Sequence, residues 1–243
     1  MVYGLISDIH ASLEAFDAVL AELAGVDAFL CLGDIVGYGP DPAACIARLR
    51  GLSPLTCIAG NHDLAAVGHY ELDWFNPYAR QAIVWTDDQL SADEKAYLSS
   101  LSLTAQVGDA LLVHGALPQP MDYITNVEEA AVTFGAMSGS LCFVGHTHVA
   151  EYYREKAGSR FCEQVPLWAG GEIALEAELR YIVNPGSIGQ PRDGNPQASF
   201  GIYDTEKGTV EVRRVGYDIN AVQKKMRDAG LPEYLIERLE RGR

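Results

Sequence analysis

The sequence of 243 residues predicts an α/β protein that folds as a single domain. Short apolar runs alternate with helical periodicity from Val2 to Ala59, and strand signals dominate between His148 and Val215. The alternation of strand and helix implies a parallel sheet with helices packed on it. Because no internal repeat, low-complexity tract or linker interrupts the chain, we expect residues 1–243 to form one domain.

The N-terminal segment predicts three strands and two helices. The strands are Val2–Ser7, Ala28–Leu32 and Leu55–Ala59, each of which has the length of a buried strand. Between the first two strands, apolar residues recur at three- and four-residue spacing from Leu13 to Leu23, which indicates a helix. Asp41 followed by Pro42 is typical of a helix N-cap and first turn, so a second helix is expected from there to about Leu49.

The stretch from Leu64 to Leu101 interrupts this rhythm and has a helical pattern throughout. Asn76-Pro77 predicts a cap within this insertion, and Ser91 to Glu94 matches a capping box. A hairpin is expected next, with strands Leu103–Val107 and Ala110–Val113 joined by Gly108-Asp109. A further helix follows Asn126, and Leu141–Val144 reads as a strand.

The C-terminal third changes to strands and ends in helices. The predicted strands are Val149–Tyr153, Arg180–Val183, Ser199–Tyr203 and Val210–Val215. Two helices are expected after them, about Asn220–Ala229 and Glu233–Arg241, separated by Gly230-Leu231-Pro232.

Composition predicts a globular enzyme of a reducing compartment. Hydrophobic residues make up 48% of the chain and charged residues 21%, near the average for globular proteins. No apolar run approaches the roughly 20 residues of a membrane span, and no basic, signal-like segment precedes the first strand. The five cysteines lie mostly in apolar runs and read as buried thiols, so we expect a cytoplasmic location and no membrane partner.

The charge balance argues against extended nucleic acid as a partner. The net charge is −15, and no stretch rich in lysine and arginine could displace the counterions of a polyanion. The C-terminal helices are the most basic segment, but acidic residues are mixed among their basic ones. The oligomeric state is left open.

Five of the six histidines fall in four short clusters at or just after the ends of apolar runs. The clusters are Ser7-Asp8-Ile9-His10, Gly60-Asn61-His62-Asp63, His114-Gly115 and Gly145-His146-Thr147-His148, and Gly33-Asp34 follows a further apolar run in the same way. Carboxylate, amide oxygen and imidazole are ligands of small divalent transition metals. The set predicts a two-metal hydrolytic centre.

The position of these clusters suggests how they meet. Ligands of α/β proteins bind beyond the carboxyl ends of the strands, so a single sheet edge is expected to gather the five clusters. In an extended backbone, Asp8 and His10 would point to one side, as would His146 and His148. The glycines beside the motif residues would let the backbone bend sharply.

These motifs resemble those of the calcineurin-like metallophosphoesterase superfamily, which are D-x-H, G-D, G-N-H-D/E, H and G-H-x-H in this order. The segment from Asn184 to Arg192 also looks like the loop after the last motif in its compact bacterial phosphodiesterase-like branch. The resemblance implies a four-layer α/β/β/α sandwich with mixed sheets. Helices inserted at about residues 64–101 and a helical tail at about 219–241 would complete it.

The resemblance also implies a role for each motif residue. Asp8, His10 and His148 would hold one metal, and Asn61, His114 and His146 the other. Asp34 would bridge the two. The metals would be two divalent transition ions, Mn, Fe, Zn, Co or Ni, and a hydroxide between them would attack phosphorus. His62 would not be a ligand; as an imidazolium it could protonate the leaving group.

Two weaker signals concern the substrate. The Ser/Thr protein phosphatases of this superfamily carry an Asp and an Arg where this chain has Gly37 and Tyr38, which makes phosphoprotein substrates doubtful. Arg192 could contact phosphate, or it could be a surface residue in a turn. The sixth histidine, His69, is expected to serve packing or the surface.

Four aromatic residues in or near the motif loops and the insertion could have either of two roles. They are Tyr38, Trp74, Phe75 and Tyr78. They could form a wall on which a nucleobase stacks, or a small aromatic core under the inserted helices.

The leading functional hypothesis is therefore hydrolysis of small phosphate mono- or diesters, with nucleotides and dinucleoside polyphosphates as plausible substrates. The alternatives are a Ser/Thr protein phosphatase, a nuclease, and a non-catalytic metal-binding scaffold on the same fold. Retention of His62 together with every ligand position argues against the scaffold.

Overall fold

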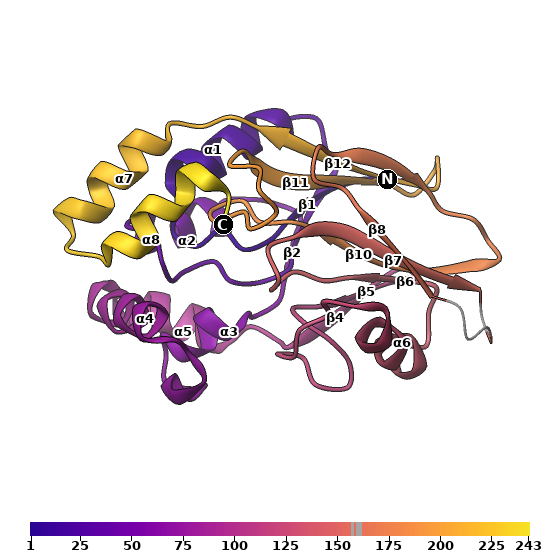
Figure 1. Ribbon diagram of the computed structural model, residues 1–243, viewed down its shortest axis with the longest axis horizontal. Helices are drawn as coiled ribbons and strands as arrows, with labels where there is room; N and C mark the ends of the chain where they lie inside the picture. Colours follow the sequence, from indigo (N-terminus) through magenta and orange to yellow (C-terminus); the bar gives the residue numbers. More distant parts are fainter. Residues whose placement is uncertain (157, 159–161) are drawn as a thin grey trace.

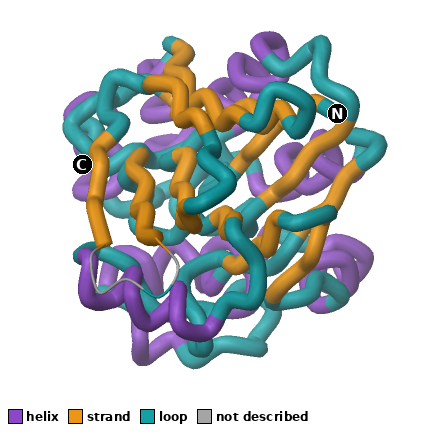
Figure 2. The backbone as a smooth tube through the Cα atoms, turned by 90° about the vertical axis from the view of Figure 1, so that its right-hand side faces the viewer, coloured by secondary structure: helices purple, strands orange, loops and turns teal. Residues whose placement is uncertain are grey.

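The structure is a computed structural model that describes residues 1–156, 158 and 162–243. Two six-stranded sheets pack face to face, and helices cover their outer faces (Figure 1). Figure 2 shows the strands gathered in the middle of the molecule and helices at its periphery. The predicted α/β/β/α sandwich with mixed sheets is confirmed.

The first sheet contains the three N-terminal strands. Its order is β3 (Leu55–Cys57), β2 (Ala28–Cys31), β1 (Val2–Ile6), β11 (Ala198–Asp204), β12 (Thr209–Val215) and β9 (Gly171–Ala174). β1, β2 and β3 run parallel, as their alternation with helices predicted, while β11 pairs with β1 antiparallel. The parallel arrangement therefore covers only half of this sheet.

The second sheet repeats this plan with later strands. Its order is β4 (Thr104–Val107), β5 (Ala110–Val113), β6 (Leu141–Phe143), β10 (Leu179–Pro185), β7 (Ala150–Lys156) and β8 (Cys162–Pro166). The parallel strands β5, β6 and β10 lie beside antiparallel neighbours. The sequence missed β8 and β9 because both are short edge strands, and only Ile173 among their residues is buried.

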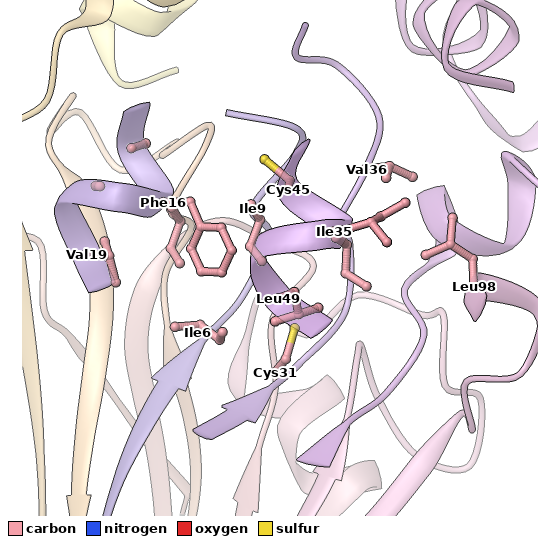
Figure 3. Close-up of a cluster of buried hydrophobic side chains, with 14 of the residues drawn as sticks. Ile6, Ile9, Phe16, Val19, Cys31, Ile35, Val36, Cys45, Leu49 and Leu98 are labelled. Carbon is pink, nitrogen blue, oxygen red and sulfur yellow. The ribbon is translucent and has the colours of Figure 1, made fainter. Parts of the chain in front are cut away.

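Three apolar layers hold the sandwich together. Side chains such as Leu30 and Phe143 fill the space between the sheets. Outside the first sheet lie α1 (Leu13–Glu22) and α2 (Pro42–Arg50), and outside the second lies α6 (Val127–Ala136). Figure 3 shows Ile9, Ile35 and Val36 in the first outer layer, together with Phe16 of α1 and Leu49 of α2.

The insertion is less regular than its sequence pattern predicted. It contains α3 (Asn61–Ala65), the short 3-10 helix η1 (Leu72–Trp74), α4 (Pro77–Gln89) and α5 (Ala92–Ser99). Asn76 and Ser91 cap α4 and α5 as expected. The helical pattern is interrupted after α3, where Gly68 adopts a left-handed backbone with φ of 76°.

The C-terminal helices pack on the insertion and lie at the predicted positions, but the second one is divided into an α-helix and a 3-10 turn. α7 (Ile219–Asp228) is followed by α8 (Glu233–Glu237) and the 3-10 helix η2 (Arg238–Arg241). Their buried residues, such as Leu235 and Met226, form one cluster with Tyr38 and with alanines of α4. Asp41 and Pro42 stand at the predicted N-cap and first turn of α2. The Asp41 side chain makes no capping bond there and instead forms an ion pair with Lys225 of α7 at 2.8 Å. Among the described residues, no helix is both long and apolar enough to cross a membrane.

We predict that Ile9→Ala destabilises the protein, because Ile9 is fully buried and anchors the loop between Asp8 and His10. The cavity left by truncation of a buried isoleucine should lower the free energy of unfolding by about 2–5 kcal/mol in urea titrations. Val132→Ala serves as the control, since Val132 is 58% exposed on α6. An unchanged unfolding midpoint for Ile9→Ala would show that this loop does not depend on its apolar anchor.

Candidate metal centre and substrate cavity

The motif residues converge from both sheets. Asp8 and Asp34 follow β1 and β2, and Asn61 opens α3 beyond β3. His114 follows β5 and His146 follows β6 of the other sheet. The expectation of a single sheet edge is therefore wrong: the carboxyl ends of parallel strands from two facing sheets meet at one place.

The backbone at these residues is left-handed rather than extended. The non-glycine residues with positive φ include five motif residues: Asp8 (52°), His10 (47°), Asp34 (53°), His146 (68°) and His148 (60°). This conformation is costly for residues with a Cβ and persists only where the surroundings enforce it. Strained loop backbone therefore places these side chains. The extended geometry expected for the D-x-H motif at Asp8 and the H-x-H motif at His146 is not found.

Glycine is required here mainly for space. A Cβ on Gly60 would lie 2.0 Å from Oδ1 of Asp34. A Cβ on Gly145 would lie 2.1 Å from Oγ of Ser7. At Gly33 a φ of 94° adds the predicted need for a sharp bend. Close approach of neighbouring loops therefore applies to all three glycines, since a Cβ on Gly33 would meet the backbone of Gly60, and backbone bending is a second reason at Gly33.

Six of the predicted residues form two overlapping groups of metal-ligand atoms. Asp8, His10, Asp34 and His148 each offer one atom, all within 4.8 Å of one another. Asp34, His114 and His146 form a second group by the same measure. Asp34 belongs to both, with its Oδ2 3.6 Å from Nε2 of His10 and 3.3 Å from Nε2 of His114. The geometry suits two neighbouring cations that share one carboxylate.

Backbone carbonyls orient three of the imidazoles. Nδ1 of His10 lies 3.1 Å from the carbonyl of Val36, and Nδ1 of His114 lies 2.7 Å from that of Leu32. Nδ1 of His148 lies 2.7 Å from the carbonyl of Gln190. A proton on each Nδ1 leaves Nε2 as the free lone pair, which is the arrangement found around metal-binding histidines.

The donor atoms fit metal ions because their hydrogen bonding is otherwise incomplete. Within the described part of the chain, four buried atoms of predicted ligands have no hydrogen-bond partner: Oδ2 of Asp34, Oδ1 of Asn61, Nε2 of His114 and Nε2 of His146. Buried polar atoms are rarely left unpaired in proteins. Divalent cations would satisfy all four at once.

Burial and the two carboxylates govern the protonation of these histidines. Burial lowers the pKa of His10 and of His148 well below the usual value and lowers that of His146 to about 3. These three imidazoles are therefore neutral, the form that binds metals. Burial also acts on His114, but Asp34 outweighs it and raises the pKa of His114 to about 10. The same negative field that holds this proton would attract a cation.

His62 lies beside the ligand groups but faces the cavity. Its ring contacts those of His10, Tyr38 and Phe75 at centroid distances of 4.8, 4.4 and 4.9 Å. Burial lowers its pKa to about 4, so the imidazolium expected from the sequence is replaced by a neutral imidazole. Its Nδ1 is buried and has no partner among the described residues, which leaves it available to a ligand.

The loop from Asn184 to Arg192 positions the motifs, a role that the sequence did not reveal. The Asn184 amide donates to the carbonyl of Gly145 at 2.7 Å, and the Ser187 hydroxyl donates to the carbonyl of Asp8 at 2.9 Å. The backbone N–H of Arg192 donates to the carbonyl of His148 at 3.0 Å. The loop therefore ties the first and last motifs together, and its resemblance to the family loop and its Asn-Pro-Gly turn were the sequence signals of it.

A cavity of about 600 Å³ opens beside these groups. Its lining includes Asn61, His62 and His146 together with residues of the insertion and of the C-terminal helices. This volume suits a small-molecule ligand. Figure 1 shows α4 and α8 on either side of this end of the molecule. His69, as expected, is an exposed residue outside the ligand groups.

The aromatic residues of the insertion line this cavity. Trp74 is 78% exposed and Tyr78 is 46% exposed, so these two do not form the small core that was the alternative reading. Phe75 packs on His62, and Tyr38, only 6% exposed, also lines the cavity. The predicted substrate residue Arg192 is there as well, half-buried and bound to the Tyr38 hydroxyl at 3.2 Å.

The family model of the calcineurin-like phosphoesterase superfamily domain matches residues 1–208. The chain belongs to this superfamily. It is a phosphoesterase hydrolase of a metal-dependent family, and its buried Asp and His clusters could bind metal.

Individual relatives agree with this assignment. The crystal structure of a metallophosphoesterase from Sphaerobacter thermophilus is 44% identical, with a TM-score of 0.91 over 100% of this chain and 99% of that one. An uncharacterized protein of Methanocaldococcus jannaschii, MJ0912, is 37% identical over 99% of this chain and 98% of its own. A symmetrical bis(5'-nucleosyl)-tetraphosphatase from Acidovorax sp. strain JS42 is 30% identical over 86% of this chain and 72% of its own.

We predict that Gly37→Ala lowers turnover, because a Cβ at residue 37 would lie 2.4 Å from Nδ1 of His62 and displace its ring. Gly68→Ala is the matched control: both glycines have positive φ, but a Cβ at residue 68 meets nothing within 4 Å. The two variants should lose similar stability, about 1 kcal/mol or more, from backbone strain. Steady-state rates and thermal unfolding separate the two effects. Equal rates in both variants would contradict the proposed crowding of His62.

Proposed function

We propose that the protein hydrolyses small phosphate esters at a centre of two divalent transition-metal ions, Mn, Fe, Zn, Co or Ni. The observation that carries this proposal is the pair of ligand groups that share Asp34. Four buried ligand atoms there, Oδ2 of Asp34 among them, have no hydrogen-bond partner in the described part of the chain. Asp8, His10 and His148 would hold one ion and Asn61, His114 and His146 the other, with Asp34 between them. When bound, two such ions lower the pKa of a coordinated water towards about 7 and offset charge on the phosphoryl oxygens.

The residues of the chain orient the metal ligands and supply a hydrogen-bond donor to the substrate. Three carbonyls fix the ligand imidazoles, so little reorganisation is needed when a substrate arrives. His62 faces the same cavity, and as a neutral imidazole it donates a hydrogen bond to the leaving-group oxygen or to the phosphoryl group.

The shape and charge of the site favour small substrates. A cavity of about 600 Å³ between two helical walls is too small for a folded protein segment, and the net charge of −15 disfavours extended nucleic acid. Gly37 stands where the Ser/Thr protein phosphatases carry an Asp beside the catalytic histidine. The space at Gly37 is filled by the ring of His62, which supports a phosphoesterase of small molecules over a protein phosphatase.

Nucleotides and dinucleoside polyphosphates are the substrates that we favour within this class. Trp74 and Tyr78 present exposed aromatic surface to the cavity, and a nucleobase stacks well on such rings. The Acidovorax relative is named for a dinucleoside polyphosphate, which supports the same choice.

The test is metal analysis combined with turnover of bis(p-nitrophenyl) phosphate in the presence of Mn²⁺. His62→Ala should keep its metal content and lose about 10²–10³ of its rate, because a preorganised hydrogen-bond donor to the reacting group contributes about that much. Asp34→Asn should lose metal, because both ligand groups depend on this carboxylate. Asp88→Asn, which changes an exposed residue by the same chemistry, is the control for both readouts.

Two outcomes would refute this proposal. Reconstituted protein with no bound ion would remove the centre altogether, and equal metal loss in His62→Ala and Asp34→Asn would contradict the division of roles. Bound metal without turnover of any phosphate ester would favour the non-catalytic scaffold.

We predict that Trp74→Ala weakens the binding of nucleotide substrates more than the binding of p-nitrophenyl phosphate. Loss of one stacking face should raise the KM for nucleotides by about two- to tenfold, since aromatic pairs contribute about 0.5–1.5 kcal/mol beyond buried area. Val84→Ala, an exposed apolar position on α4, serves as the control. A uniform effect on both substrates would instead indicate that Trp74 supports the packing of the insertion.

A further inference from the structure

Two arginines line the cavity without an acidic side-chain partner among the described residues. Arg192 and Arg238 both contribute to its wall. Over the described ranges 1–156, 158 and 162–243, neither guanidinium has a side-chain carboxylate within 4.0 Å, although the chain carries 33 acidic residues. Other arginines nearby in the sequence do form ion pairs: Arg214 pairs with Asp193, and Arg241 pairs with Glu237 at 3.9 Å.

Arg192 is held next to the predicted metal ligands. One of its terminal nitrogens donates to the Tyr38 hydroxyl at 3.2 Å and to Oε1 of Gln190 at 2.9 Å. Its guanidinium lies 5.6 Å from the centre of the Tyr38 ring, and the same ring contacts His10 at 4.6 Å. Arg192 therefore stands one side chain away from the ligand groups, and its buried Nε lacks a partner in the described structure.

Arg238 reaches the cavity from the C-terminal helices. The apolar side of these helices, including Leu235, Ile236 and Leu239, is buried against α4 and Tyr38, which fixes the start of η2. The Nε of Arg238 donates to the main-chain oxygen of Arg243, and its guanidinium lies 5.5 Å from the centre of the Tyr234 ring. No partner within the described residues is found for its two terminal nitrogens.

Electrostatics links the two arginines. Burial lowers the pKa of Arg238, and the charge of Arg192 lowers it further, so the two guanidinium groups repel one another. Like charges left without counterions in a partly buried cavity are unfavourable, and an anion between them removes this cost. The flat face of a guanidinium and its paired N–H groups match the oxygens of a phosphoryl group.

We propose that Arg192 and Arg238 form a second phosphoryl-binding subsite, so that the preferred substrates carry a further phosphoryl group beside the one that is hydrolysed. This inference rests on the proposed function and narrows its substrate class to esters of nucleoside polyphosphates. Tyr234 stacks on Tyr78 at 4.8 Å, which extends the subsite toward the aromatic wall of the cavity. Arg238 lies beyond residues 1–208 that the family model matches, so this part of the subsite is contributed by the C-terminal helices.

The test compares ADP with AMP, which differ by one phosphoryl group, as inhibitors of bis(p-nitrophenyl) phosphate hydrolysis by the full chain at constant free Mn²⁺. In the wild type, ADP should inhibit at concentrations at least about tenfold lower than AMP, because charge-assisted hydrogen bonds are the stronger kind. Arg238→Ala should reduce this ratio to near one, and Arg238→Lys should restore part of it. Arg241→Ala, which removes the same charge from the same short helix outside the cavity, should keep the wild-type ratio.

Equilibrium dialysis of ADP and AMP against the metal-loaded proteins separates this inference from the proposed function. Dialysis could show that the ratio of ADP affinity to AMP affinity falls in Arg238→Ala while no ester is hydrolysed. This result would refute the catalytic proposal and support the subsite. Hydrolysis with the same ADP-to-AMP ratio in wild type and Arg238→Ala would overturn the subsite alone. An equal fall of the ADP-to-AMP ratio in Arg238→Ala and Arg241→Ala would also overturn the subsite, since the ratio would then depend on overall charge.

Discussion

The buried carboxylates of Asp8 and Asp34 impose the constraint on which the rest of this structure depends. A charge away from water is stable only where hydrogen bonds or opposite charges surround it. Oδ1 of Asp34 accepts the backbone N–H of His62 at 2.9 Å, and Oδ1 of Asp8 accepts that of His146 at 3.2 Å. Each carboxylate thus takes a donor from another motif loop, and in the case of Asp8 from the facing sheet. The ligands cannot be moved apart without leaving a charge unsatisfied.

A third carboxylate reinforces the same loops without facing the ligand groups. Asp63 accepts three backbone N–H groups, from Ile35, Val36 and Gly60. It joins the loop after β2 to the start of α3, so Asp34 and His62 are held by the same hydrogen-bonded unit. Burial nevertheless raises the pKa of Asp63 to about 7, because the three hydrogen bonds offset only part of the cost of burying its charge. Apolar anchors such as Ile35 supply the rest of the support from the other side of the loop.

The motifs could be predicted from sequence because their residue types are unusual at the ends of apolar runs. Six of the predicted ligand residues, from Asp8 to His148, lie close together in the structure, while their roles at a metal centre stay a prediction. Their backbone conformation could not be predicted, because left-handed φ at residues such as His10 is enforced by distant neighbours. The edge strands β8 and β9 carry few buried residues and gave no periodic signal. The protonation of His62 depends on burial, which only the assembled loops create.

The contribution of the C-terminal helices to the cavity was likewise invisible in the sequence. In the sequence, Arg238 is one charged residue in a helix of mixed charge. The packing of α8 with α4 places Arg238 in the lining of the same cavity as Arg192. Arg192 itself was a weak candidate because a turn arginine is usually solvated. Local sequence predicts which helices form, whereas long-range packing decides which of their polar residues share a cavity.

The position of β1 in the first sheet has a consequence for the biogenesis of the enzyme. β1 is synthesised well before the segments that complete its surroundings: its register partners include Tyr203 of β11, and the carbonyl that orients His148 belongs to Gln190. During synthesis, a nascent chain can display the early histidines long before the segments that aim them have emerged. Contacts so distant along the chain slow folding. At the proposed metal centre, selective cation capture would therefore require almost the entire polypeptide.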